Sequence, residues 1–464
     1  MNSRQLAAWL IWAGSLTASV PANAATLLEI YRLALDNDAT LQSARALRDA
    51  NQEKIPQARS GLLPSMGGQA QVLRQRSETD IAGPNGVQTG LTSTPKSISF
   101  NLTQPLYRPA AWRNYEQSRL LVAQADLQYA LARQDLVLRV GQAYFDILAV
   151  QDTIDTLASQ KIAIDQQLEA AKRNFKIGTA TITDQQEAQS RHDLVVAQQI
   201  AAHNELLAKR AALENIIGQP APPLARLSGA TPLPGPEPAT AEPWIVAAEA
   251  NNYRVQINEL TRAINDRESA KTRASHLPTL DLTSQLGRSQ QSTFYGGGAT
   301  IADVRTANIG IALALPIFNG GAVTSRVREA DGLVRKAEQD LTAARRQASL
   351  QARQSFVGVQ SGLAQIGALE AAERSSQLAL NANKLGYEVG VRINIDVLNA
   401  QQQLASARRD LARAKYDTLL NTLKLKAAAG SLSEADLQAI SGLLEAAATV
   451  PGSVVPHPDS GAGS

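Results

Sequence analysis

The fold is decided by one stretch of sequence, Tyr387-Glu388-Val389-Gly390-Val391-Arg392-Ile393-Asn394-Ile395-Asp396-Val397-Leu398-Asn399-Ala400. Its pattern indicates the end of one helix, a turn at the glycine and the start of a second helix. A weaker copy lies 212 positions earlier, Phe175-Lys176-Ile177-Gly178-Thr179-Ala180-Thr181-Ile182-Thr183-Asp184. Gly178 aligns with Gly390, and Asp184 aligns with Asp396. Each glycine therefore predicts the turn of a helical hairpin.

The rest of the chain falls into two similar halves around these turns. Leu63-Pro64 recurs as Leu277-Pro278, and Ile216-Ile217-Gly218 is echoed by Ala428-Ala429-Gly430, so the order of elements is preserved. Each half is predicted to contain a short helix, a strand pair, a long helix, a glycine turn and a further helix. The predicted boundaries are a first repeat at 25–219 with strands in 62–107, a proline-rich extended linker at 220–243, and a second repeat at 244–445 with strands in 277–318.

The first 24 residues have the pattern of a secretory signal peptide. Arg4 precedes a mostly apolar run, and Ala22-Asn23-Ala24 offers a cleavage site. No later stretch has ~18 consecutive apolar residues, so no transmembrane helix is predicted. The chain has no cysteine, which excludes disulfides, thiolate metal sites and a lipid-bearing N-terminal cysteine. The proline-containing end, 446–464, is predicted to be a flexible periplasmic tail.

Both predicted strand pairs alternate between apolar and polar or small side chains. In the first half, Ile98, Phe100 and Leu102 alternate with polar residues. In the second, Ile309 and Ile311 belong to a longer run of the same kind. An ordinary soluble two-stranded sheet would give the same local pattern.

The long helix of the second half carries a heptad seam, which is typical of a left-handed coiled coil. From Gly320 to Leu385 it would be ~100 Å long. The helices before the strands and after the turns are about half as long, so we expect two short helices to stack along each long one. The seam residues are Val323, Val327, Ala330, Val334, Ala337, Leu341, Ala344 and Ala348.

Four amphipathic strands are too few to close a barrel, because the smallest outer-membrane barrels need ~8. An open edge in lipid would leave backbone groups unpaired. We therefore expect several chains to share one barrel. Two copies would supply eight strands and three would supply twelve, and the strand pattern leaves this choice open.

The sequence does not indicate an enzyme, a cofactor or a metal site. The four histidines are His192, His203, His276 and His457. His192 and His203 share a helix face but lie eleven residues apart, about 16 Å, which is too far for one metal ion. Basic residues are scattered and the net charge is +3, so no nucleic-acid partner is predicted.

The duplicated layout and the Tyr387–Ala400 stretch resemble the TolC family of outer-membrane channel-tunnels. Two further segments carry the resemblance, Leu419-Leu420-Asn421-Thr422-Leu423-Lys424-Leu425-Lys426 and Gly430-Ser431-Leu432-Ser433-Glu434-Ala435-Asp436-Leu437. The resemblance implies a mainly α fold with a membrane β-barrel part. In such a homotrimer, a twelve-stranded outer-membrane β-barrel continues into a long periplasmic α-helical coiled-coil barrel.

The resemblance also implies the function of a passive exit duct in the outer membrane of a Gram-negative bacterium. Its partners would be a periplasmic adaptor (membrane fusion) protein and an inner-membrane ABC or proton-driven transporter. The cargo would be proteins of type I secretion, small molecules such as drugs, or both. The missing N-terminal cysteine places the chain nearer the non-lipidated members that serve type I secretion and drug export.

The family pattern further implies a gate at the two turns. Tyr387 and Arg392 match latch positions, and their implied partners are Asp184 and the backbone around Thr183. Gly178 and Gly390 mark the tip turns on which a partner would dock. A solvated helix-end charge or helix cap is the simpler interpretation of each charged residue.

Asp396 matches an aspartate that forms a ring at the pore constriction of such proteins. A second acidic ring is common one turn further along, where this chain has Asn399. A single acidic ring is therefore expected here, with weaker cation preference.

A soluble periplasmic coiled-coil scaffold or adaptor is the alternative function, because long helices alone would suffice for it. Two duplicated strand pairs at matching positions favour the duct, since an adaptor has no use for them.

Overall fold

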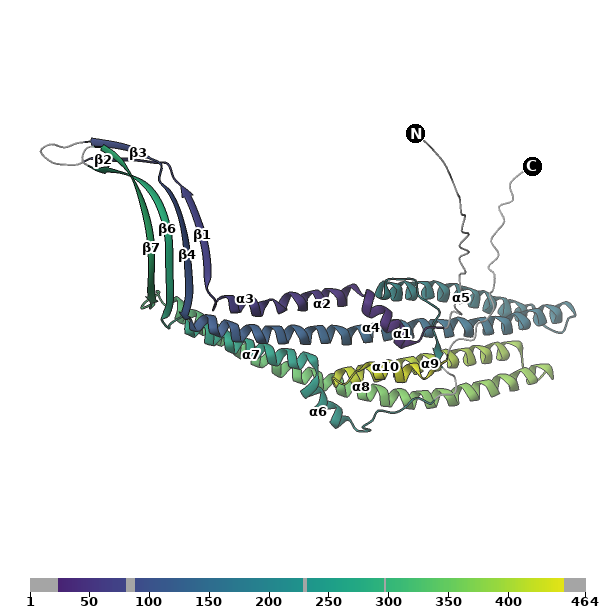
Figure 1. Cartoon of the computed structure of the whole chain (residues 1–464). Helices are drawn as coiled ribbons and strands as arrows, with labels where there is room; N and C mark the ends of the chain where they lie inside the picture. Colours follow the sequence, from purple (N-terminus) through teal and green to yellow (C-terminus); the bar gives the residue numbers. More distant parts are fainter. Residues whose placement is uncertain (1–23, 81–87, 228–231, 296–297, 446–464) are drawn as a thin grey trace, which may run out of the picture.

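The computed structural model describes residues 24–80, 88–227, 232–295 and 298–445. It shows a long rod of helices with a curved sheet projecting from one end (Figure 1). The predicted tail and all but the last residue of the predicted signal peptide lie outside the described residues. Within the described ranges, none of the helices combines the length and the apolar content that a membrane span requires.

The first half is built on one very long helix, α4 (Pro109–Lys176), whose 68 residues correspond to ~100 Å. Before the strands come α1 (Leu27–Asn37), α2 (Ala39–Gln52) and α3 (Lys54–Ser60). After the turn comes α5 (Ile182–Ile217). Both groups pack along α4, which confirms the expected stacking of short helices on a long one (Figure 1).

The break between α1 and α2 at Asp38 is not apparent in the apolar periodicity of residues 26–58. The Asp38 carboxylate caps α2 by accepting a hydrogen bond from the Leu41 N–H at 2.7 Å. It also accepts two hydrogen bonds from the Arg139 guanidinium of α4, at 2.9 and 3.0 Å. Burial acts to raise the pKa of Asp38, but the bonds from Arg139 and Leu41 outweigh it and hold the pKa below its ordinary value. This buried ion pair fixes the helix break against α4.

The second half repeats this arrangement with α6 (Ala241–Asn251), α7 (Tyr253–Ala274), α8 (Ala322–Glu388) and α9 (Asn394–Ala428). The long helix α8 has 67 residues, one fewer than α4. A short helix, α10 (Glu434–Ser441), follows α9.

The heptad seam predicted for the long second helix is confirmed. Small alanine side chains along it let α7 lie close to α8. The buried members of the seam are Val323, Ala330, Ala337 and Ala348, and the half-buried members are Val327, Val334, Leu341 and Ala344.

Four strands form one antiparallel sheet in the order β1-β4-β6-β7. The first half contributes β1 (Ser65–Val72) and β4 (Lys96–Tyr107), and the second contributes β6 (Thr279–Tyr295) and β7 (Gly298–Ala314). The central β4–β6 pairing therefore joins the two halves. A further antiparallel pair, β2 (Gln75–Asp80) with β3 (Gln88–Ser93), extends the first pair at the far end of the sheet, within the predicted strand region 62–107 (Figure 1).

The sheet leaves large apolar side chains uncovered. Phe100 on β4 is 54% exposed, and Ile309 on β7 is 77% exposed. Within the part of the chain that the structure describes, β1 and β7 each pair on one side only. The sheet thus keeps two open edges and an apolar surface, which water would not favour.

Arg108 ties the sheet to the helical rod. It directly precedes α4, and its Nε and Nη2 atoms donate to the two carboxylate oxygens of Asp281 on β6, both at 2.8 Å. This bidentate pair fixes the point where strands give way to helices.

The two halves share their largest core, which includes part of the segment predicted to be an extended linker. Leu224 and Ala225 are buried there, and the Tyr144 hydroxyl of α4 donates to the Ala225 carbonyl oxygen at 2.7 Å. β5 (Arg226–Leu227) pairs with β8 (Leu444–Glu445) near the end of the described chain. The linker is therefore anchored between the halves, because its backbone and apolar side chains find partners on both.

Gly430, just after α9, supplies a stability test of the packing between the end of α9 and the end of α6. Its φ is +70°, and a Cβ there would overlap the carbonyl oxygen of Asn251. Gly430→Ala is expected to destabilise the fold by roughly 2 kcal/mol or more, because it adds left-handed strain to that overlap. The measurement is the thermal unfolding midpoint, followed by helical circular dichroism in detergent.

Gly367→Ala is the matched control, since Gly367 lies in the middle of α8 and a Cβ added there would meet nothing within 4 Å. This variant is expected to unfold at the wild-type temperature or slightly above it. Equal midpoints for the two variants would contradict the packing of Gly430 against Asn251.

Candidate functional site

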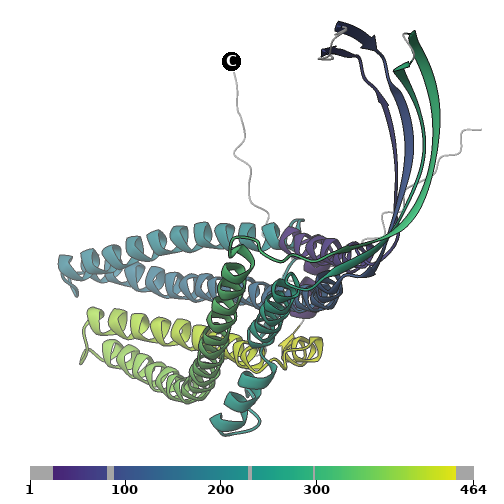
Figure 2. The same ribbon diagram turned by 90° about the vertical axis from the view of Figure 1, so that its left-hand side faces the viewer.

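The two glycine turns lie together at the end of the rod farthest from the sheet. Gly178 joins α4 to α5, and Gly390 joins α8 to α9. Figure 1 shows both turns at the same end of the molecule, and Figure 2 shows the two helix pairs as separate hairpins that run side by side. The structure thus brings together two segments that are 212 residues apart in the sequence.

The two turns close with the same backbone hydrogen bonds. In the first, the Asn174 carbonyl accepts from the N–H of Thr179 at 2.9 Å and from that of Ala180 at 3.3 Å. In the second, the Gly386 carbonyl accepts from Val391 at 2.9 Å and from Arg392 at 3.1 Å.

Both turn glycines have a φ of +81°. A Cβ at Gly178 or Gly390 would meet no atom within 4 Å, so the requirement for glycine is purely conformational.

Each new helix has a capping aspartate as its third residue. The Asp184 carboxylate accepts from the Thr181 N–H at 2.9 Å and from the Thr181 hydroxyl at 2.7 Å. The Asp396 carboxylate accepts from the Ile393 N–H at 3.5 Å. Within one chain, both aspartates therefore have the role of a helix cap.

The predicted latch contacts are not made within a single chain. The Tyr387 hydroxyl accepts from Asn174 Nδ2 at 3.2 Å, and Arg392 lies 3.7 Å from Asp396 as an ion pair. Among the hydrogen bonds of the described residues, none joins Tyr387 to Asp184 or Arg392 to the backbone at Thr183. The physical reason is that the Asp184 carboxylate turns back to cap its own helix.

The structure identifies polar contacts between the hairpins that the sequence analysis missed. Asn394, the first residue of α9, is only 1% exposed. Its Nδ2 atom donates to the Asp184 carbonyl oxygen at 3.2 Å, and its Oδ1 atom accepts from Gln167 Nε2 of α4. Arg191 of α5 donates to Asn399 Oδ1 at 2.9 Å. The spacing of Asn394 and Leu398 on one helix face was the signal that could have indicated burial.

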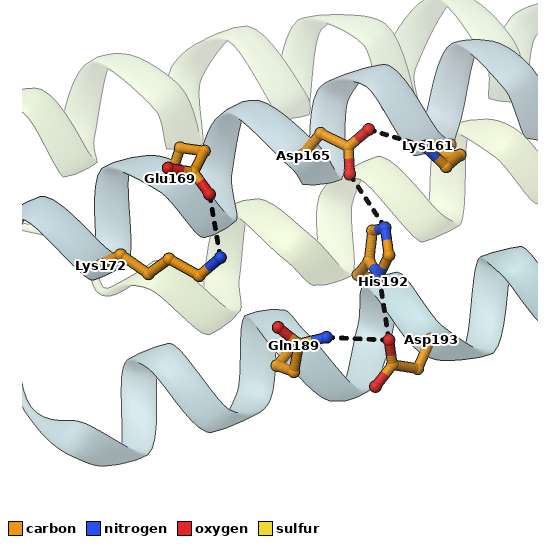
Figure 3. Close-up of polar contacts among 7 residues, drawn as sticks. All are labelled: Lys161, Asp165, Glu169, Lys172, Gln189, His192 and Asp193. Atoms are coloured by element: carbon orange, nitrogen blue, oxygen red, sulfur yellow. Dashed lines mark hydrogen bonds and ion pairs between the residues drawn. The ribbon is translucent and has the colours of Figure 1, made fainter. Parts of the chain in front are cut away.

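Between the turns and the middle of the rod, charged side chains join α4 to α5. Figure 3 shows His192 of α5 between Asp165 and Asp193, with its ring nitrogens 3.1 and 3.0 Å from their carboxylates. Hydrogen bonds from His192 and Gln189 lower the pKa of Asp193 below its ordinary value. Among the described residues, no group of three or more potential ligands could hold a metal ion.

The turns also expose large apolar side chains. They lie at the end of the rod, around both glycines. The side chains are Phe175 and Ile177 in the first turn, with Leu385, Val389, Val391 and Ile393 in the second.

Comparison with known proteins gives one family. The family model described as outer membrane efflux protein matches residues 30–219 and 244–431. The chain is 32% identical over 434 residues to outer membrane protein TolC of Vibrio cholerae, covering 94% of this chain and 97% of that protein. It is 31% identical over 452 residues to alkaline protease secretion protein AprF of Pseudomonas aeruginosa, covering 95% and 92%.

A solved structure has the same fold. The CmeC outer membrane channel of Campylobacter jejuni superposes with a TM-score of 0.75 at 19% sequence identity. The superposition covers 90% of this chain and 89% of the channel.

Proposed function

The chain belongs to the outer membrane efflux protein family, and from this we infer that it is an outer-membrane exit duct for secretion and efflux. It works in export systems driven by an inner-membrane transporter, and it has a large periplasmic part. The observation that carries this conclusion is the family match over most of both halves. The adaptor alternative is not favoured, because it leaves the four-stranded apolar sheet without a purpose.

The duct is proposed to be a homotrimer. The open edges of β1 and β7 would pair between neighbouring chains, because lipid offers no partner for their backbone groups. Three sheets of four strands would give a twelve-stranded barrel. The exposed apolar residues of β4 and β7, among them Phe100 and Ile309, would then face lipid.

The chain is further proposed to consist of two structural repeats, 25–219 and 244–445. The matching turn geometry at Gly178 and Gly390 and the two separate segments of the family match support this division. Cleavage of residues 1–24 and a free tail at 446–464 remain part of the proposal.

The paired turns are proposed to be both the gate and the docking surface. A periplasmic adaptor and the transporter would contact the apolar tips around Gly178 and Gly390. Asp396 and Asn399 would line the constriction when three chains meet. A cargo of proteins, small molecules or both is compatible with this duct.

The latch is proposed to involve Tyr387 and Arg392. Within one chain, Tyr387 contacts Asn174 and Arg392 contacts Asp396. In the assembly, Asp184 and Thr183 of a neighbouring chain would complete the latch. Such contacts contribute roughly 1 kcal/mol each, so three copies hold the gate and still release it when a partner docks.

The test of the duct is its assembly in the membrane. Detergent is expected to be required for extraction, and the mass by light scattering should be three times that of the chain. The heat-dissociated sample is the control for the mass of one chain. Recovery from the periplasm without detergent would overturn the duct, whereas a mass of two chains would overturn only the stoichiometry.

The test of the latch is conductance in planar bilayers. Tyr387→Phe combined with Arg392→Ser should raise the mean conductance severalfold, because it removes two contacts from each of three chains. Tyr253→Phe combined with Arg254→Ser is the control, since it makes the same chemical changes on α7, far from the turns. A latch variant as closed as the control would show that the assignment is wrong.

The test of the constriction is ion selectivity. Asp396→Asn should weaken both the cation preference and the block by multivalent cations, because it removes three charges and keeps an oxygen for the Ile393 N–H. The control is Asp36→Asn on the exposed side of α1. If reversal potentials of both variants equal that of the wild type, Asp396 does not line the pore.

A further inference from the structure

Near the turns, the two helix hairpins have separate apolar cores. The α4–α5 hairpin has its own cluster, which includes Leu157, Ile164 and Val195. The α8–α9 hairpin has another, formed by Leu380, Val397 and Leu404. Leu398 is the one residue of α9 in the first cluster as the described residues define it. Little apolar contact therefore holds one hairpin against the other at this end.

Asn394 is the centre of the polar contact between them. Its side chain is almost completely buried, and both ends of its carboxamide have partners. Oδ1 accepts from Gln167 of α4, while Nδ2 donates to the backbone oxygen of Asp184 on α5. Burying an amide costs free energy unless its hydrogen bonds are made. The two partners therefore fix the position of the Asn394 side chain.

Arg191 makes a second contact between the same hairpins. Its guanidinium donates to Asn399 Oδ1 at 2.9 Å and also to the side-chain oxygen of Gln402. Both acceptors belong to α9, and Arg191 belongs to α5. The Asn399 side chain therefore accepts a hydrogen bond from a cationic side chain of its own chain.

One heptad further from the turns, the same interface is poorly satisfied. Gln401 is 5% exposed, and its Oε1 atom has no hydrogen-bond partner among the described residues; the same holds for Oε1 of Gln160. Gln160 precedes Gln167 by seven residues, and Gln401 follows Asn394 by seven, so the antiparallel register sets them at the same level. These two acceptors add no hydrogen bond between the hairpins. Arg191 with Gln402 therefore makes the contact at this level, and Asn394 makes it nearer the turns.

We propose that an amide clamp, formed by Gln167, Arg191, Asn394, Asn399 and Gln402, sets the closed position of the α8–α9 hairpin against the α4–α5 hairpin. This clamp rests on the proposed function of a gated duct, and it acts as a positioning device within each chain. Opening the duct requires these contacts to break, since they bridge the two hairpins beside the turns.

The test is Asn394→Leu in planar bilayers. The variant keeps the side-chain size but removes the hydrogen bonds to the Gln167 amide and to the Asp184 carbonyl. The ratio of open to closed time should rise roughly tenfold, as expected for the loss of buried hydrogen bonds. Asn381→Leu is the matched control, because Asn381 is exposed on α8 and its side chain accepts a hydrogen bond from Gln377 of its own helix.

Arg191→Gln is the second variant, and it covers the case in which Asn394→Leu fails to fold. Arg191 is part of an exposed contact, so its replacement should open the gate without preventing assembly. If either variant folds and its ratio of open to closed time equals that of the wild type and of Asn381→Leu, the clamp is wrong. The proposed function of a duct would not be affected by that result. A wild-type protein that forms no pore at all would overturn the proposed function itself.

A crosslinking rescue separates gating from general damage. The chain has no cysteine, so Arg191→Cys with Asn399→Cys creates one defined pair. Loss of the clamp should open the channel formed by this double variant. A short bifunctional thiol reagent should then restore the wild-type ratio of open to closed time. Either single-cysteine variant treated in the same way should stay open, and restoration there would contradict the clamp.

Discussion

In the part of the rod that leads to the turns, the placement of the two halves depends on the contact between α4 and α9. At the end of this contact farthest from the turns, Gln134 of α4 donates to the Ala427 carbonyl of α9 at 2.9 Å. In the middle, the Tyr416 hydroxyl donates to Asp152 at 2.6 Å, and burial raises the pKa of that carboxyl. Beside the turns, Gln167 contacts Asn394. The shared core and the proposed gate thus lie at two ends of one interface. This interface is apolar at the shared core and includes amide contacts beside the turns.

The sheet adds a constraint of a different kind. Its strands keep two open edges and an uncovered apolar surface, and Arg108 fixes the whole sheet to the start of α4. In the proposed duct, further copies of the chain would pair with these edges, because lipid cannot satisfy unpaired backbone groups. The same copies would bring the turns of neighbouring chains together. In the proposed trimer, one assembly would therefore close both the barrel in the membrane and the gate at the turns.

Several features could be predicted from the sequence because a local rule fixes them. Gly178 and Gly390 were predictable because a left-handed helix end needs glycine. The α8 seam and the strands were predictable from their periods of 3.5 and 2. The break at Asp38 and the anchoring of the proline-rich linker were not, since both depend on distant partners, Arg139 and Tyr144.

At the candidate site, too, local features could be predicted from the sequence and contacts with distant residues could not. The sequence by itself determined where the turns lie, which residues begin each helix, and that Asp184 and Asp396 occupy equivalent positions. Only the tertiary structure decided that these aspartates cap their own helices and that Asn394 and Arg191 join the hairpins. The physical reason is that periodicity records which face of a helix is buried, whereas the residue opposite that face is set by packing across more than 200 positions of chain.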